Sequence, residues 1–355
     1  MDKNFWNGKK VFLTGHTGFK GTWLSFILNF LGADVTGYSL EPPTNPNLFS
    51  LINLEKNIHS VIGDIRDFEK LKKTFDEFKP EIVFHLAAQP LVRLSYEIPV
   101  ETYETNVMGS INVMEAARVT DSVKVVVMIT TDKCYENREQ IWGYRENEPM
   151  GGYDPYSSSK GAAEIAINSW RRSFFNPDDY GKKHHVSIAS VRAGNVVGGG
   201  DWAKDRIVPD CIRALEAGRP IEIRNPKAIR PWQHVLEPLS GYLLLASKML
   251  QEPTKYCEGW NFGPRAESIT SVWDVSTMLT RYYGRGELKD VSNLDALHEA
   301  NLLLLDITKA KFRLGWEPRT NIEQCCQLTA DWYKRYQLED VSELCLEQID
   351  KFCSK

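Results

Sequence analysis

Residues 123–135 read Val-Lys-Val-Val-Val-Met-Ile-Thr-Thr-Asp-Lys-Cys-Tyr. The run at 123–129 is short, rich in β-branched residues and apolar, which predicts a strand buried on both faces of a parallel sheet. It ends in two hydroxyls, a carboxylate and an ammonium at residues 130–133. Because open α/β sheets bind ligands at the carboxyl ends of their strands, we expect the chemistry of this chain at that edge.

Other segments repeat the pattern on both sides of this strand. Strands are predicted near 10–14, 34–38, 58–62, 82–85 and 186–191, and helical stretches such as 68–78 and 107–118 separate them. Alternating strands and helices predict βαβ units and an α/β fold with a doubly wound parallel sheet. After residue 191 the elements shorten: a helix near 208–217, a strand at 221–224, a helix near 236–249, a strand near 259–262 and C-terminal helices. We therefore expect one domain at 1–192 and a second region, interwoven with it, at 193–355.

The bulk composition excludes several classes of protein. The chain has 355 residues, of which 42% are hydrophobic and 25% charged, as in an ordered protein outside the membrane. A formal net charge of −4 gives no reason to expect nucleic acid. The N-terminus lacks an apolar signal core, and no apolar run reaches membrane-spanning length. Seven cysteines without a Cys-x-x-Cys pair favour a reducing cytoplasm, and we predict no disulfide framework and no metal site.

A glycine-rich turn joins the first strand to the first helix. It comprises Gly15, His16, Thr17, Gly18, Phe19, Lys20 and Gly21. Glycines at this spacing allow a sharp turn, close approach to a pyrophosphate and packing of helix on strand, and the helix N-terminus attracts phosphate. The turn therefore predicts a dinucleotide site. For His16 and Lys20 we weigh two alternatives, solvent-facing side chains or contact with the phosphates or ribose.

The second strand gives little help with the choice of dinucleotide. Residues 37–40 offer neither the acid that usually holds an NAD ribose nor an arginine for an NADP phosphate, and Glu41 is displaced. We favour NAD. Asp64 and Ile65 follow the third strand and are expected at the adenine edge. For Asp64 and Asp67 the alternative is capping of the next helix.

Tyr156 and Lys160 are four residues apart in a helical segment, so they share one helix face. A nearby ammonium stabilises a phenolate, and we therefore expect it to lower the pKa of the tyrosine toward that of a base. The lysine would also reach the nicotinamide ribose. Tyr-x-x-x-Lys alone is frequent, but it is specific beside the glycine turn and a strand that ends in Thr-Thr.

These features together resemble the extended short-chain dehydrogenase/reductase family, in its branch that modifies nucleotide sugars. The resemblance extends over most of the chain and rests on the turn, Asp64 with Ile65, residues 85–89, Asn106, Thr130 with Thr131, Tyr156 with Lys160, and the pattern at 306–318. It implies a modified Rossmann domain at 1–192 that binds NAD and carries the catalytic residues, and a smaller substrate-binding region after it. Cofactor contacts are implied for Leu86, Ala87, Ala88, Asn106 and Thr130.

Within that family, residues 131–133 decide the reaction. Epimerases carry small, non-acidic residues there, whereas 4,6-dehydratases carry Thr-Asp-Glu, in which the Asp protonates the departing C6 hydroxyl and the Glu removes the C5 proton. This chain has Thr131, Asp132 and Lys133. Lysine at that place, with residues 151–156 and 192–202, implies a dehydratase that acts on CDP-glucose. The rivals are another nucleotide-sugar dehydratase, a C4-epimerase and, in a different class, a dinucleotide-binding sensor.

The chemistry of the sugar agrees with this resemblance. Its C5 proton is not acidic until C4 is a ketone, so oxidation must come first. In that step Tyr156 as phenolate takes the C4 hydroxyl proton while hydride passes to NAD, and Thr131 hydrogen-bonds the same oxygen. Water then leaves across C5–C6, which needs an acid and a base at one strand end, Asp132 and Lys133. Lys133 is a base only if it is neutral, which Asp132 opposes, so electrostatic stabilisation of the enolate is the alternative.

The nucleoside diphosphate requires cationic partners from the second region. Planar guanidinium groups suit phosphate, and the candidates are Arg206, Arg224 and Arg230, with surface salt bridges as the alternative for Arg206 and Arg224. The resemblance implies that Arg230 binds the pyrophosphate, that Asn195 and Gln89 contact the substrate, and that the helices near 100–118 and 156–172 form a homodimer or homotetramer. The expected setting is the route to 3,6-dideoxy sugars of bacterial surface polysaccharide.

Overall fold

The computed structural model describes residues 2–293 and 300–354. Within these residues, seven strands form one sheet in the order β11-β6-β5-β4-β1-β2-β3, and every neighbouring pair is parallel. The strands are β1 (Lys10–Thr14), β2 (Asp34–Ser39), β3 (His59–Ile62), β4 (Ile82–His85), β5 (Val125–Ile129), β6 (Ser187–Ala193) and β11 (Gly259–Phe262). The predicted α/β class and parallel sheet are therefore confirmed.

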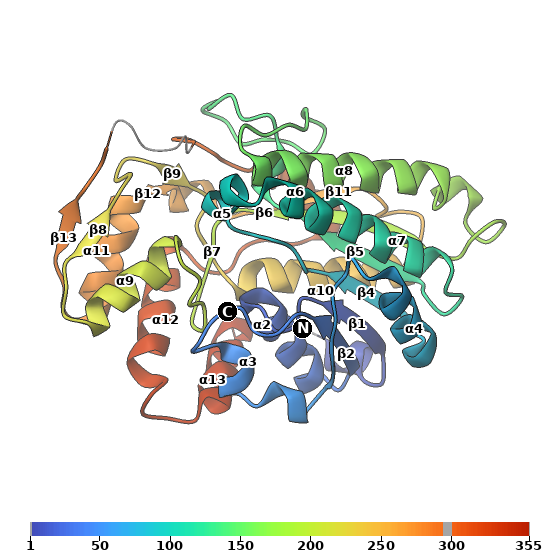
Figure 1. The fold of residues 1–355 in the computed structure, drawn as a ribbon, viewed down its shortest axis with the longest axis horizontal. Helices are drawn as coiled ribbons and strands as arrows, with labels where there is room; N and C mark the ends of the chain where they lie inside the picture. The colour runs from blue at the N-terminus through green and yellow to red at the C-terminus, as the bar shows by residue number, and fades with distance from the viewer. Residues whose placement is uncertain (1, 294–299, 355) are drawn as a thin grey trace.

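Helices cover both faces of this sheet (Figure 1). α4 (Phe68–Phe78), α7 (Gly109–Arg118) and α8 (Pro155–Ser173) pack on one face, and α2 (Phe19–Phe30) and α10 (Leu236–Gln251) on the other. Strand β5 contributes to both cores, because Val125, Val127 and Ile129 lie in the core with α2 and α10, whereas Val126 and Met128 lie in the core with α7 and α8. This alternation confirms that the strand is buried on both faces.

The second half of the chain builds a smaller group of elements beside the sheet, at the left of Figure 1. Its short strands pair as β7 (Val196–Val197) with β10 (Gln233–His234), β8 (Ile221–Ile223) with β13 (Leu288–Asp290), and β9 (Ile229–Arg230) with β12 (Thr270–Ser271). The helices are α9 (Ile207–Glu216), α11 (Val272–Tyr283), α12 (Ile322–Arg335) and α13 (Val341–Cys353). Strand β11 returns from this half to the edge of the main sheet, beside β6.

Short helices complete the first half: α1 (Lys3–Trp6), α3 (Leu48–Leu51), α5 (Val92–Glu97) and α6 (Pro99–Tyr103). The predicted helix at 107–118 begins at Gly109, because residues 104–108 form a π-helical turn after α6. The predicted strand at 123–129 begins two residues later, at Val125. Within the described residues, no helix combines the length and apolar character that crossing a membrane would require.

Parallel strands bring their carboxyl ends to one edge, and the contacts there are close. At the end of β1, the Thr14 Oγ1 hydroxyl lies 2.8 Å from His85 Nδ1 at the end of β4, and it accepts a hydrogen bond from the Leu86 amide at 3.1 Å. The turn that follows β5 begins at the same edge. The fold therefore gathers the predicted motifs in one region.

Candidate active site

The glycine turn follows β1 and opens α2, as predicted. Gly15 has a φ of +81°, and a Cβ there would meet the backbone of Ala87 after β4. A Cβ on Gly21 would occupy the position of the Gly15 carbonyl group. Both positions therefore require glycine, and the free amides at the start of α2 make this turn a place for a phosphate group.

His16 points inward from this turn. Its ring is fully buried, contacts Phe49 edge-on and places Nε2 2.7 Å from Ser60 Oγ of β3. Burial lowers the pKa of His16 to about 4, so the ring is neutral at pH 7. The solvent-facing alternative for His16 is therefore wrong, because the imidazole ties the turn to β3 instead.

Lys20 lies on the first turn of α2, among charged groups of the predicted site. Burial and the charges of Arg206 and Lys160 lower its pKa to about 8, while Asp132 and Asp201 act in the opposite direction. Lys20 therefore lies near enough to Asp132, Lys160 and Arg206 for their charges to act on its ammonium group.

Other predicted cofactor residues form the walls of the turn. Thr17 Oγ1 lies 2.9 Å from Ser39 Oγ and donates to the Leu40 carbonyl at 2.8 Å. Gly18 is the N-cap residue of α2, and Phe19 packs against the core.

Asp64 and Ile65 follow β3. Asp64 accepts hydrogen bonds from the side chain of Arg66, which together with the Arg66 amide outweigh partial burial and lower the Asp64 pKa. Ile65 is buried next to Gly109 of α7. The side chain of Asp67 accepts from the Lys70 amide and caps α4, which confirms the capping alternative for that residue.

The loop after β4 is held in place by hydrogen bonds. The Leu86 and Ala87 amides both donate to Thr14 Oγ1, and Ala88 follows them. Asn106 Oδ1 accepts from the Gln89 amide at 2.8 Å, and Asn106 Nδ2 donates to the Gln89 carbonyl and, at 2.9 Å, to Ser159 Oγ of α8. Asn106 lies in the π-helical turn, a kind of irregularity often found at functional sites.

The turn after β5 brings two predicted residues into direct contact. Thr131 Oγ1 donates to Asp132 Oδ1 at 2.9 Å, and Asp132 is fully buried. The other oxygen, Oδ2, has no hydrogen-bond partner among the described residues. Burial raises the Asp132 pKa, although Lys133, Thr131 and Arg230 act against it. A buried carboxyl of raised pKa with one free oxygen is suited to donate a proton.

Tyr156 and Lys160 lie on the first turns of α8. The Asp154 side chain caps this helix, and the Tyr156 amide donates to Ser95 Oγ of α5 at 3.1 Å. Both side chains are buried. Burial raises the Tyr156 pKa, which a hydrogen bond with Thr131 only partly offsets, so the predicted lowering by Lys160 is wrong for the protein alone. Burial lowers the Lys160 pKa to about 8.

The three candidate arginines differ in their surroundings. Arg230 is buried, donates to the Ile229 carbonyl and lies near enough to Asp132 to influence its pKa. Arg206 pairs with Asp201 at 2.9 Å and influences Tyr156. Arg224 is 41% exposed and pairs with Asp205 at 2.6 Å. Asn195 accepts from the Gln233 amide through its carbonyl, beside β7 and β10.

Two residues of the region escaped the sequence analysis. Arg93 of α5 lies 3.8 Å from Asp205, across from Arg224, and Asp201 is the partner of Arg206. Arg93 lies at the start of α5, in the segment that follows the buried strand β4, and that place was a usable signal. Asp201 was noted only as part of residues 192–202, and its pairing with Arg206 is defined by the fold.

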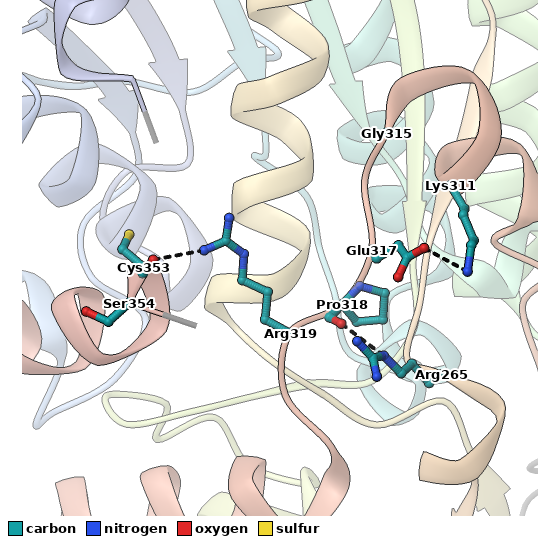
Figure 2. A pocket seen from close by; sticks show the side chains of 8 residues that line it. All are labelled: Arg265, Lys311, Gly315, Glu317, Pro318, Arg319, Cys353 and Ser354. Carbon is teal, nitrogen blue, oxygen red and sulfur yellow. Dashed lines mark hydrogen bonds and ion pairs between the residues drawn. The ribbon is translucent and has the colours of Figure 1, made fainter.

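A surface hollow of about 660 Å³ lies elsewhere, at the C-terminal part of the chain (Figure 2). Its lining consists of Arg265, Lys311, Gly315, Glu317, Pro318, Arg319, Cys353 and Ser354. The cations there have protein partners: Lys311 pairs with Glu317 at 2.7 Å, Arg265 donates to the Pro318 carbonyl and Arg319 to the Cys353 carbonyl. None of the predicted site residues lines this hollow.

Comparison with known proteins agrees with this geometry. A family model described as GDP-mannose 4,6 dehydratase matches residues 12–329. A CDP-glucose 4,6-dehydratase of Salmonella typhimurium is 55% identical over 336 residues, which cover 95% of this chain and 93% of that protein. A dTDP-glucose 4,6-dehydratase of Xanthomonas campestris is 25% identical over 90% of this chain and 92% of that protein.

Solved structures show the same fold. A UDP-glucose 4-epimerase of Thermotoga maritima with UDP-glucose has a TM-score of 0.78 at 25% identity, over 93% of this chain and 99% of that chain. A dTDP-glucose 4,6-dehydratase of Bacillus anthracis in complex with NAD has a TM-score of 0.77 at 20% identity, over 93% and 98% of the two chains. Both are similar in the arrangement of sheet and helices.

Proposed function

The chain belongs to the GDP-mannose 4,6 dehydratase family, and we propose that it is an NAD-dependent hydro-lyase that converts CDP-glucose to CDP-4-keto-6-deoxy-glucose and water. The observation that carries this proposal is the turn with Asp132 and Lys133 beside Tyr156 and Lys160. Epimerisation at C4 needs only the tyrosine and lysine, whereas loss of water needs an additional acid, and Asp132 is a buried carboxyl of raised pKa. The choice of CDP rests on the 55% identity to a CDP-glucose 4,6-dehydratase.

The residues present fit a dinucleotide. Gly21 lies so close to the Gly15 carbonyl that a side chain has no room there, so no side chain covers the backbone at this position. The start of α2 offers backbone amides to a pyrophosphate. Asp64 and Ile65 would lie at the adenine, and Leu86 to Ala88, Asn106 and Thr130 along the remaining wall. NAD bound there would supply the redox chemistry, as acceptor of the hydride from the sugar C4 and as its donor to C6. Its positive charge would also favour the Tyr156 phenolate over the phenol.

The proton transfer that accompanies oxidation of the sugar depends on Tyr156, Thr131 and Lys160. Tyr156 as phenolate accepts the proton of the C4 hydroxyl, and Thr131 holds the same oxygen. Lys160 lies one helical turn away on α8, from where its ammonium would stabilise the phenolate when the cofactor is bound and would reach the ribose of the cofactor. Lys160 acts in this way only while it is protonated, and its pKa is about 8.

The elimination step depends on the turn after β5, which carries Asp132 and Lys133. Asp132 gives its proton to the departing C6 hydroxyl, which leaves as water. Lys133 stands at the C5 side, either as the base that removes the C5 proton or as a cation that stabilises the enolate. Arg206, Arg230, Arg224, Asn195 and Gln89 would bind the diphosphate and the sugar, with Arg230 and Arg206 nearest the catalytic groups.

The wider setting follows from the same family. Residues 1–192 would bind the cofactor and residues 193–355 mainly the substrate. Helices α6 to α8 lie side by side in Figure 1 and expose apolar side chains, which supports a homodimer or homotetramer through them. All seven cysteines are free thiols, which supports a reducing cytoplasm. The product would feed the synthesis of CDP-linked dideoxy sugars of surface polysaccharide.

The proposal is tested by mass spectrometry of CDP-glucose, UDP-glucose and dTDP-glucose, each incubated with the protein and NAD. Loss of one water from CDP-glucose in preference to the other two supports both the reaction and the base. Unchanged mass with inversion at C4 means an epimerase, and unaltered sugars with bound NAD mean a sensor. Net NADH release contradicts a redox-neutral reaction.

A further inference from the structure

One buried ion pair holds both ends of the turn that carries Asp132 and Lys133. Thr130, just before this turn, donates from Oγ1 to Glu164 Oε1 of α8 at 2.5 Å. Tyr135, just after it, accepts a hydrogen bond at its hydroxyl from Arg192 Nη1 of β6 at 2.7 Å. Glu164 and Arg192 are joined by two hydrogen bonds of 2.9 and 2.8 Å.

This pair is unusually enclosed for two charges. The side chains of Arg192 and Glu164 are 6% and 4% exposed. Despite burial, Arg192, with bonds from Thr130 and Ser190, holds the pKa of Glu164 well below its ordinary value, so the carboxylate stays charged. Apolar side chains of similar size are often as stabilising as a buried pair. Stability alone therefore does not explain the pair, and its partners at the turn point to another role.

The pair also links the turn to the helix of the oxidising groups. Glu164 follows Lys160 by four residues on α8, one turn of helix further along. Between them Gly161 lets the helix approach the turn closely, because a Cβ there would press on the carbonyls of Gly151 and Cys134. Beyond Tyr135, the network continues through its hydroxyl to Asn261 Oδ1 of β11 at 2.7 Å.

We propose that Glu164 and Arg192 are positioning residues that fix Asp132 and Lys133 relative to Tyr156 and Lys160. The inference rests on the proposed function and deepens it. Oxidation at C4 and elimination across C5–C6 occur on one bound sugar, so two sets of side chains must be aligned at the same time. A shift of the turn would misplace the acid and base of elimination and leave Tyr156 and Lys160 on their helix, so elimination would slow more than oxidation.

We call the two hydrogen bonds Thr130–Glu164 and Arg192–Tyr135 the clamp. The test removes one of these bonds at a time and leaves the ion pair between Glu164 and Arg192 intact. Thr130→Val loses the bond to Glu164, and Tyr135→Phe loses the bond from Arg192. Because Thr130 also lies along the proposed wall of the cofactor site, the affinity of each variant for NAD is measured and rates are taken at saturating NAD. Ser190→Ala is the matched control, since Ser190 Oγ donates to Glu164 Oε2 at 2.8 Å from β6 without flanking the turn. Thermal unfolding of each variant is measured first, and rates are expressed per folded enzyme.

In Thr130→Val and Tyr135→Phe we expect kcat for CDP-glucose to fall about tenfold or more, with KM nearly unchanged, and enzyme-bound NADH to accumulate during turnover. Ser190→Ala should turn over without such accumulation. The inference is overturned if the two clamp variants behave like Ser190→Ala, or if oxidation and elimination slow together and NADH does not build up. The wild-type enzyme is run in parallel, and the mass of its product, lower than that of CDP-glucose by one water, tests the proposed function itself.

Discussion

At the scale of single residues, Asp132 has an environment that suits a proton donor. Burial raises its pKa, and Oδ2 has no partner among the described residues. In Asp132→Asn we expect kcat to fall by roughly 10²- to 10⁴-fold, the usual contribution of a general acid, with KM little changed. Rapid-mixing absorbance should show NADH accumulating, because oxidation needs no acid at C6. A variant that turns over within tenfold of wild type would contradict the assignment.

Arg230 and Arg224 give a second comparison between residues. Arg230 is buried near Asp132, whereas Arg224 is exposed and paired with Asp205. We expect Arg230→Gln to raise KM for CDP-glucose about ten- to hundredfold, as befits loss of a charge-assisted bond to phosphate. Arg224→Gln is the matched control and should raise KM by no more than about fivefold. Equal effects in the two variants would show that burial is not what distinguishes them. Initial rates over a range of substrate concentrations supply both values.

Sequence patterns identified the chemistry-bearing side chains better than their surroundings. Thr131, Asp132, Tyr156 and Lys160 stood out by residue type and spacing, and the structure gathers them. The inward orientation of His16 was not predictable, because its partner Ser60 is 44 residues away and on another strand. The raised Tyr156 pKa was missed for a related reason, since burial is a property of the packed fold and outweighs the hydrogen bond with Thr131.

At the scale of elements, His16 makes the turn between β1 and α2 sensitive to acid. Its folded-state pKa is about 4 against an ordinary 6.5, so the unfolded chain binds more protons between these values. The free energy of unfolding should therefore fall as the pH is lowered from about 6.5 to about 4, by roughly 3 kcal/mol for this residue. Burial lowers the pKa of His85 to about 3, which contributes in the same direction.

Urea unfolding at pH 7 and pH 5 measures this effect. His16→Phe keeps an aromatic ring against Phe49 but cannot titrate, so its stability should change less between the two pH values than that of wild type. The exposed His185 provides a matched control, because His185→Gln removes a histidine without touching the core. If His16→Phe loses as much stability as wild type on acidification, the buried ring is not responsible.

Element types were predictable from periodicity and their ends less so. Strand β4 and helix α4 fall at the predicted residues, because β4 is a short continuous apolar run and Asp67 marks the start of α4. The π-helical turn at 104–108 leaves no periodic pattern in the sequence. It is held by hydrogen bonds of Asn106 with Gln89 and Ser159, which are distant in the sequence. The pairing of β11 with β6 likewise depends on contacts between distant parts of the chain.

At the scale of the whole molecule, α6, the π-helical turn and α8 present apolar groups on the surface. Val100, Met108 and Ile165 are 71, 51 and 62% exposed. We expect the wild-type protein to have a mass twice or four times that of the chain by light scattering, and Ile165→Asp to shift it toward the monomer. Leu338→Asp is the control, since Leu338 is 81% exposed after α12. An assembly unaffected by Ile165→Asp would place the interface elsewhere.

The order of the strands explains how one site arises from distant segments. β5 lies between β4 and β6, so the turn after it is flanked by the loop of Gln89 on one side and by Arg192 on the other. The second half adds Arg206 and Arg230 above the same edge. Oxidation and elimination can therefore be served by groups that are far apart in the sequence but lie near one another at this edge of the sheet.

The most direct test of the proposed reaction follows a label within the substrate. CDP-glucose carrying deuterium at C4 is incubated with the protein and NAD, and the product is analysed by NMR. We predict that the deuterium leaves C4 and appears at C6 of CDP-4-keto-6-deoxy-glucose, because the hydride removed in oxidation is the one returned after water is lost. Deuterium retained at C4 of the recovered sugar, or found in NADH that is released into solution, would contradict the account.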